Sequence, residues 1–173
     1  TGIFWFTIAT FIEVEEFGQI HYMLAIAGLA YIVAQIGTAN TITVYSAKKV
    51  NVVSTLFLFS LLAGGTSALV VFLISNQLST SFLILGFLVN DLALGYLLGN
   101  KLFKNYSKYV LTQKILTLLL GFGFYFILGP EGIIFALALS YIHFAILAYK
   151  GLKASPISFS ALKPRAGFIV NNY

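Results

Sequence analysis

The chain has 173 residues, of which 60% are hydrophobic and only 9% are charged, and its formal net charge is +5. Soluble domains carry about 25% charged residues, and a soluble fold of this length cannot bury so much apolar surface in one core. The absence of cysteine excludes disulfide bonds and thiolate metal sites. This composition predicts a protein whose solvent is the lipid bilayer.

Six apolar runs follow one another along the chain. The first, Gly2 to Ile12, is too short to cross a hydrocarbon core of about 30 Å. We expect it to be the end of a truncated helix, and an interfacial segment is the alternative. The other five cover residues 17–45, 52–75, 80–99, 109–128 and 133–149. Because the runs are continuous rather than alternating, they favour helices over barrel strands. We therefore predict an all-α, polytopic bundle of six transmembrane helices.

The end of the chain differs from these runs. Residues 152–173 mix polar and apolar side chains and contain Pro156 and Pro164. They predict a cytoplasmic linker followed by a short amphipathic segment, so that residues 1–151 form the six-helix transmembrane lobe.

The charged residues predict the orientation of the chain. All ten basic residues fall near alternate connections: Lys48, Lys49, Lys101, Lys104, Lys108, Lys114, Lys150, Lys153, Lys163 and Arg165. The other connections carry Glu13, Glu15, Glu16 and Glu131 and no basic residue. The positive-inside rule then places the basic connections and both ends of the chain in the cytoplasm, with the cell membrane as the location. Anionic headgroups rather than nucleic acid are the expected partners of these cations.

One acidic residue lies far from any connection. Asp91 is near the middle of the run 80–99, where a lone charge costs about 2.5–3.5 kcal/mol on insertion scales. Gly95 and Gly99 share its helix face and allow another helix to approach closely. Asn90 lies beside it. Two interpretations stay open: Asp91 belongs to a cation, proton or substrate path, or it is a protonated side chain that hydrogen-bonds across a helix interface.

Further polar residues within the runs are candidates for a cavity wall. His21, Gly28 and Gln35 recur every seven residues and so lie near one face. Ser140 and His143 share a face three residues apart and form a weak candidate for an intramembrane nucleophile and base. For all of these, ordinary polar packing between helices is the alternative.

A third group lies at the start of the fifth long run. Gln113, Lys114 and Thr117 cluster near its cytoplasmic end. Lys114 either reaches into a cavity and meets a phosphate or extends to the membrane interface.

Several motifs resemble one family of transporters. The stretch Glu15-Glu16-Phe17-Gly18, the Gly37 that closes the apolar part of the second run, and the turn Gly129 to Gly132 are similar to features of the polysaccharide flippases. These proteins are relatives of the lipid II flippases and of the multidrug and toxic-compound extrusion transporters. The segment Phe159 to Phe168 resembles the basic amphipathic segment that precedes their seventh helix. The sequence departs from the pattern at Val14, where proline is usual.

The resemblance implies a fold and a function. The chain would be the first lobe of a two-lobe transporter, and it would pass a lipid-linked oligosaccharide across the membrane by alternating access against a second lobe of the same chain. Asp91, Asn90, His21, Gln35, Lys114 and His143 are the candidate substrate-binding residues. We expect no catalytic residue, no metal and no cofactor. A cation-coupled drug exporter is the first alternative, and a non-transporting membrane subunit or an intramembrane enzyme is the second.

Overall fold

The computed structural model describes residues 2–35 and 37–171, and within these ranges it contains helices and no strand. Five stretches are long and apolar enough to cross a membrane: Val14–Gln35, Val53–Ser75, Leu78–Gly99, Phe103–Leu128 and Pro130–Leu152. The first helix, α1 (Gly2–Phe11), has 10 residues and is shorter than a span. The prediction of an all-α, multi-pass membrane protein whose first helix is short is therefore confirmed.

The second run, predicted as one segment, consists of two helices. These are α2 (Val14–Gln35) and α3 (Thr38–Ala47). The chain breaks at Gly37, whose φ of 66° is a left-handed conformation that glycine adopts without steric cost. Glu15 and Glu16 lie in the first turn of α2 rather than in the connection, where their charge complements the positive end of the helix dipole.

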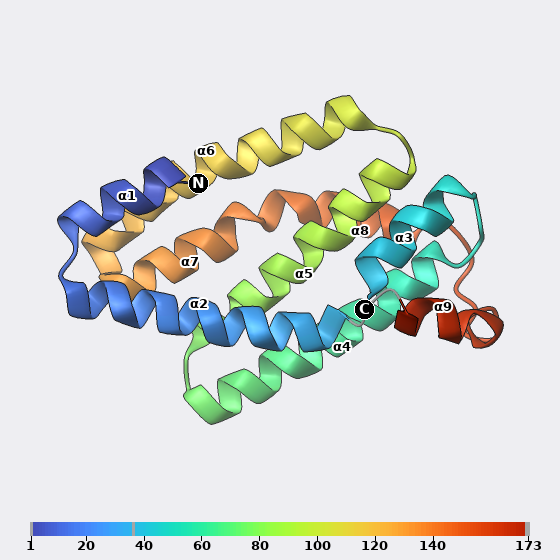
Figure 1. Ribbon diagram of the computed structural model, residues 1–173, viewed down its shortest axis with the longest axis horizontal. Coiled ribbons are helices and arrows are strands. Elements are labelled where there is room, and N and C mark those ends of the chain that lie inside the picture. The colour runs from blue at the N-terminus through green and yellow to red at the C-terminus, as the bar shows by residue number, and fades with distance from the viewer. Residues whose placement is uncertain (1, 36, 172–173) are drawn as a thin grey trace.

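The last run is also broken. Helix α7 (Pro130–Ser140) ends at Tyr141, a 3₁₀ turn η1 follows (Ile142–Phe144), and α8 (Ala145–Leu152) completes the span. The interruption tilts the second half relative to the first, as Figure 1 shows between α7 and α8. In membrane proteins such irregular backbone is found where it is buried in protein or lines a cavity.

The remaining spans are continuous. Helices α4 (Val53–Ser75) and α5 (Leu78–Gly99) begin within two residues of the predicted positions. Helix α6 (Phe103–Leu128) begins six residues before the predicted run, so Lys104 and Lys108 lie within it. Lys114 is 11 residues from its start, or about 16 Å into the helix. Lys114 therefore lies deeper in the helix than the predicted start of the run indicated, although it is still closer to the start of α6 than to its end.

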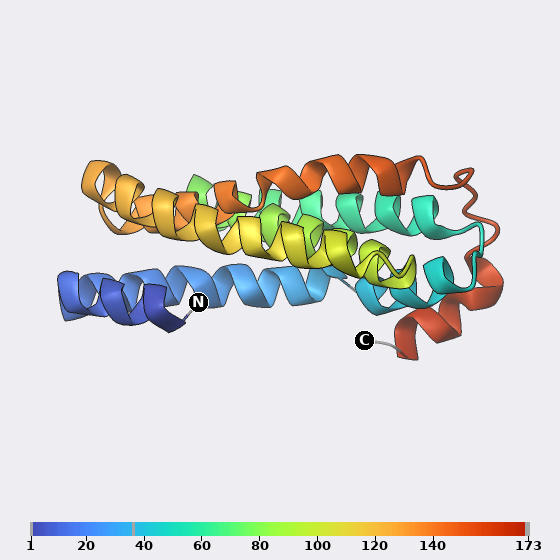
Figure 2. The same cartoon turned by 90° about the horizontal axis from the view of Figure 1, so that it is seen from above.

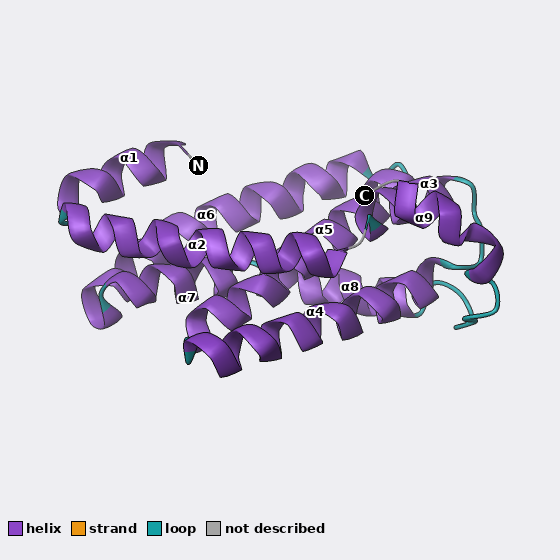
Figure 3. Cartoon of the chain, turned by 60° about the horizontal axis from the view of Figure 1, so that its bottom comes forward, coloured by secondary structure: helices purple, strands orange, loops and turns teal. Residues whose placement is uncertain are grey.

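The helices form a bundle in which α4, α5, α6 and α7 slant the same way and α2 crosses α5 at an angle (Figure 1). Helices α1, α2 and α3 lie on one side of it and α7 and α8 on the other (Figure 2). Helix α5 packs against α2, α3, α4, α7 and α8 and is the centre of the bundle. The connections before α2, α5 and α7 gather at one end, here called the glutamate-rich end, and those after α3, α5 and α8 gather at the opposite, lysine-rich end (Figure 3).

Small residues allow the closest contacts of α5. A Cβ atom on Gly95 would lie 2.7 Å from the Ala39 carbonyl oxygen, and one on Gly99 would lie 2.5 Å from that of Thr43. The predicted close approach of a helix to this face is confirmed, and the partner is α3. In α6, Gly121 makes room for the Phe4 ring, whereas Gly123 has open space around it.

The tail folds back on the lysine-rich end. It contains a 3₁₀ turn η2 (Lys163–Arg165) and a short helix α9 (Ala166–Asn171), which lies beside α3 in Figure 1. The Phe168 ring contacts the Tyr45 ring at a centroid distance of 5.3 Å. Before η2, the Ser155 and Ser158 amides donate hydrogen bonds to hydroxyls of the first turn of α4. These contacts hold the tail against the bundle.

Candidate functional site

Asp91 is the acceptor at the centre of a polar cluster between α2 and α5. The Tyr31 hydroxyl donates a hydrogen bond to its Oδ2, and the Gln35 amide donates to the same oxygen over 3.3 Å. The neighbouring Asn90 amide donates to Oδ1 over 2.9 Å. Three donors converge on one carboxyl group, so both of its oxygens have a partner. The cluster spans 60 residues of sequence and ties the end of α2 to the centre of the bundle.

The cluster lies at the depth of both helix breaks. Asp91 is eight residues from the lysine-rich end of α5, and Gln35 precedes Gly37, where α2 gives way to α3. Tyr141, the break in the last span, is 11 residues from the end of α8. At about 1.5 Å per helical residue these positions are all about 12–18 Å from that end of the bundle, so the cluster and both breaks lie at a similar depth along it. Broken helices at the midplane are typical of binding sites in secondary transporters.

A second polar site lies across an aromatic wall from this cluster. The Phe87 ring contacts Tyr31 on one side and Tyr141 on the other, each at a centroid distance of 5.7 Å. Beyond it is a pocket of about 270 Å³ that contains the side chain of Lys114. Helices α1, α2, α5, α6 and α7 all contribute to the pocket wall, which consists of Phe4, Trp5, Leu24, Phe87, Gln113, Lys114, Thr117, Leu118, Leu137 and Tyr141.

The floor of this pocket is fixed by a buried hydrogen-bond network. Gln113 donates to the hydroxyls of Thr117, over 2.9 Å, and Ser140, over 3.2 Å. Thr117 donates to Ser140, which in turn donates to the Leu137 carbonyl over 2.7 Å. Gln113 and Thr117 are about 95% buried and Ser140 is fully buried, so unpaired polar groups here would be costly. The network locks α6 to α7 and orients the wall next to Lys114.

His143 and His21 lie apart from both polar sites. The His143 Nε2 lies 3.0 Å from the Tyr109 carbonyl oxygen, and its ring stacks on Tyr109. His21 is exposed in the second turn of α2, between the rings of Trp5 and Phe17. It is 14 residues before Gln35, or about 21 Å along the helix. The structure therefore brings together Asp91, Asn90 and Gln35 from the predicted set, places Lys114 in the adjoining pocket, and leaves the two histidines outside.

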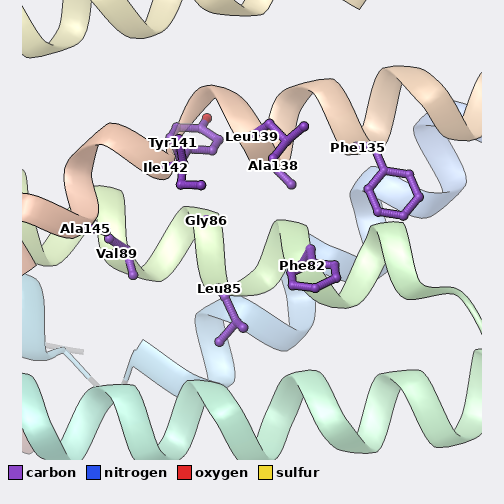
Figure 4. A pocket seen from close by; sticks show the side chains of 10 residues that line it. All are labelled: Phe82, Leu85, Gly86, Val89, Phe135, Ala138, Leu139, Tyr141, Ile142 and Ala145. Atoms are coloured by element: carbon purple, nitrogen blue, oxygen red, sulfur yellow. The ribbon is translucent and has the colours of Figure 1, made fainter. Parts of the chain in front are cut away.

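An apolar pocket of about 320 Å³ adjoins the break in the last span. Figure 4 shows it between α5 and α7, with Phe82 and Phe135 at one end and Val89 and Ala145 at the other. Tyr141 lines this pocket and the Lys114 pocket as well. The two recesses thus meet at a single side chain.

Two tyrosines of the site, Tyr31 and Tyr141, were not predicted from the sequence. Tyr31 is four residues before Gln35 and therefore lies on the same face of α2. This spacing could have indicated from the sequence that Tyr31 belongs to the same polar site. Tyr141 follows Ser140 directly, and its role depends on the end of α7 at that point. Tyrosine is common at membrane interfaces, and for this reason a tyrosine in an apolar run does not by itself indicate a polar site.

Comparison with known proteins gives no match: no family model, no curated protein sequence and no solved structure is significantly similar to this chain. The candidate function therefore rests on the residues and their geometry.

Proposed function

We propose that this chain is a lobe of a membrane transporter that moves a lipid-linked oligosaccharide across the cytoplasmic membrane by alternating access. The observation that carries the proposal is Lys114, a cation that lines a pocket about 16 Å along α6, beside the Gln113 amide and the Thr117 hydroxyl. A charge at this depth is costly, and intramembrane ionisable residues mark substrate or ion paths. The phosphate of a lipid-linked glycan is the kind of group that would offset that cost.

The neighbouring apolar pocket adds support. A lipid-linked oligosaccharide combines an anionic, hydroxyl-rich head with a long apolar chain. Two recesses meet at Tyr141. One carries Lys114 and two further polar side chains among apolar ones, which suits the head, and the other is lined by hydrocarbon and aromatic side chains, which suits the chain. The interrupted spans at Gly37 and Tyr141 provide the irregular backbone that transporters place at such sites. The second lobe that completes the cavity would come from the same chain.

Complementation tests this proposal. The full-length parent protein is expressed in a bacterial strain that lacks its polysaccharide flippase, and surface polysaccharide is measured. Restored polysaccharide is the expected result. If the protein left surface polysaccharide absent while it lowered the accumulation of cationic dyes, the flippase proposal would be wrong and a drug exporter would be favoured.

Cation coupling is a second candidate, and the Asp91 cluster favours it. Asp91 has three hydrogen-bond donors and no cationic side chain within ion-pairing distance among the residues that the structure describes. Its partners Tyr31 and Gln35 lie on the half of α2 that ends at the break, so a change of charge at Asp91 would act on the contacts that hold this end of α2. The test is transport in membrane vesicles that contain the Asp91→Asn variant. If transport by this variant depended on a proton or sodium gradient as fully as transport by the unmodified protein, this role of Asp91 would be excluded.

The intramembrane enzyme is not favoured by the geometry. Ser140 directs its proton to the Leu137 carbonyl, and the partner of His143 is the Tyr109 carbonyl. Neither side chain is placed to activate the other, although both lie near the same break.

A further inference from the structure

A polar pocket of about 280 Å³ lies at the lysine-rich end, well away from the central site. It is formed where the end of α3, the start of α4, the end of α5 and the segment after α8 meet, a region visible near α3 in Figures 1 and 3. Its polar lining residues are Tyr45, Ser46, Lys49, Asn51, Tyr96, Asn100 and Ser155.

The lining is suited to an anion. Lys49 contributes a positive charge, and Val53 places the first turn of the 23-residue helix α4 at the pocket wall. The amino end of a helix carries a partial positive charge, and in this turn the Ser54 amide already donates to the Ser155 hydroxyl over 3.2 Å. None of the five acidic residues of the sequence lies in the pocket, because four are at the glutamate-rich end and Asp91 is at mid-span. The pocket therefore offers positive charge and hydrogen-bond donors without a competing carboxylate.

Ser46 gives an independent indication of a ligand. Its side chain is 92% buried, and its hydroxyl has no hydrogen-bond partner among the described residues. Buried hydroxyls are nearly always paired, because an unpaired one loses its bonds to water without replacement. Ser46 is also part of the pocket wall, so a group bound in the pocket would adjoin this side chain.

We propose that this pocket binds a phosphate-bearing anion at the membrane surface, with Lys49 as the charged contact and Ser46 as a hydroxyl donor. A phosphate group has several acceptor oxygens and matches a lysine, a helix amino end and neutral donors at once. The phosphate comes either from a lipid headgroup or from a soluble molecule. This inference does not depend on the transport activity proposed above, and its test uses binding alone.

The experiment measures binding by the full chain purified in detergent. Two probes are used: short-chain phosphatidylglycerol, counted by native mass spectrometry, and inorganic phosphate, measured by calorimetry against chloride at equal ionic strength. The key variant is Lys49→Asn, and its matched control is Lys101→Asn. Both lysines have a left-handed backbone, with φ of 53° and 58°, which asparagine tolerates, and both lie at the same end of the bundle, but Lys101 is not part of the pocket wall.

We expect Lys49→Asn to weaken binding of at least one probe by about tenfold or more, because a charge-assisted hydrogen bond is lost, while Lys101→Asn changes it by less than about twofold. If the protein binds phosphatidylglycerol but not inorganic phosphate, the ligand is a lipid headgroup. If it binds inorganic phosphate alone, the ligand is a soluble molecule. Equal effects of the two lysine variants would show general attraction to a basic surface and would overturn the proposal, as would the absence of binding by either probe.

Ser46→Ala provides a second readout should Lys49→Asn fail to fold. It leaves the charge of the protein unchanged and removes only the unpaired hydroxyl. A built site predicts a loss of about threefold or more in affinity, since a neutral hydrogen bond is lost. Attraction to the basic surface alone predicts no change, and that result would also overturn the proposal.

Discussion

The Tyr31 hydroxyl donates a hydrogen bond to the Asp91 carboxyl group across the interface of α2 and α5. The two residues are 60 positions apart in sequence, and each comes from a different span. The contact joins the one acidic side chain that lies deep in the bundle to the helix that breaks a turn and a half later at Gly37. It therefore holds the carboxyl group against the helix that ends at this break.

Removal of this hydroxyl tests how much the contact stabilises the bundle. Tyr31→Phe should lower the free energy of unfolding by about 1 kcal/mol, since hydrogen bonds between membrane helices contribute about 0.6 kcal/mol on average and about 1.7 kcal/mol at most. The measurement is thermal or denaturant unfolding in detergent. Tyr22→Phe is the matched control on the same helix, where the side chain is 65% exposed. Equal stability of the two variants would show that the contact contributes nothing.

The close packing of α3 on α5 predicts an unequal response of two glycines. Gly99→Ala should destabilise the protein by about 1–3 kcal/mol, because its methyl group would meet the Thr43 carbonyl and the Ser46 Cβ atom at 2.5 and 2.6 Å. Gly123→Ala should be neutral or slightly stabilising, since its Cβ has open space and alanine favours helix. Unfolding of both variants in detergent gives the comparison. A Gly99→Ala protein as stable as the parent would contradict the observed approach of the helices.

The Lys114 pocket predicts which lysine of α6 matters for transport. In the complementation assay, Lys114→Gln should reduce polysaccharide export at least tenfold, because the charged contact to the substrate is lost. Lys114→Arg should retain much of the activity, since it keeps the charge. Lys108→Gln, an exposed position closer to the lysine-rich end of the same helix, is the control and should behave as the parent. Equal effects of the two glutamine variants at comparable expression would remove Lys114 from the site.

The distribution of charge predicts which end of the bundle is in the cytoplasm. Since the chain contains no cysteine, single cysteines can be introduced without background. In intact cells a membrane-impermeant maleimide should label Glu131→Cys, at the glutamate-rich end, and should label Lys104→Cys only after the membrane is permeabilised. The unmodified chain serves as the unlabelled control. The opposite pattern of labelling would reverse the assigned orientation.

Much of the fold follows from the sequence because hydropathy and charge act locally. An apolar run of about 20 residues has to cross the bilayer as a helix, so the limits of α4 and α5 are predicted to within two residues. The start of α6 was missed by six residues, because Lys104 and Lys108 lower the hydropathy there although the backbone continues as a helix. Hydropathy predicts the apolar part of a helix and not its ends.

The candidate site was predicted only in part, for a different reason. The cost of a charge in lipid singles out Asp91 from the sequence alone. Its partners depend on the rotation of α2 and α5 relative to each other and on where α2 breaks. Those are decided by packing, such as the fit of Gly95 and Gly99 against α3. Tyr31 and Gln35 were therefore brought to Asp91, and His21, on the same predicted stripe as Gln35, was left at the far end.

The sequence by itself determined that this protein is a multi-pass helical membrane protein with one lysine-rich and one glutamate-rich end, because each of these properties is a sum over neighbouring residues. Only the tertiary structure decided that Asp91 meets Tyr31, that Lys114 lines a pocket formed by five helices, and that the Ser46 hydroxyl is buried without a partner among the described residues, in the same pocket wall as Lys49. These contacts depend on which side chains of separate helices lie at the same depth and face one another. The packing of the helices, and not the local sequence, determines this.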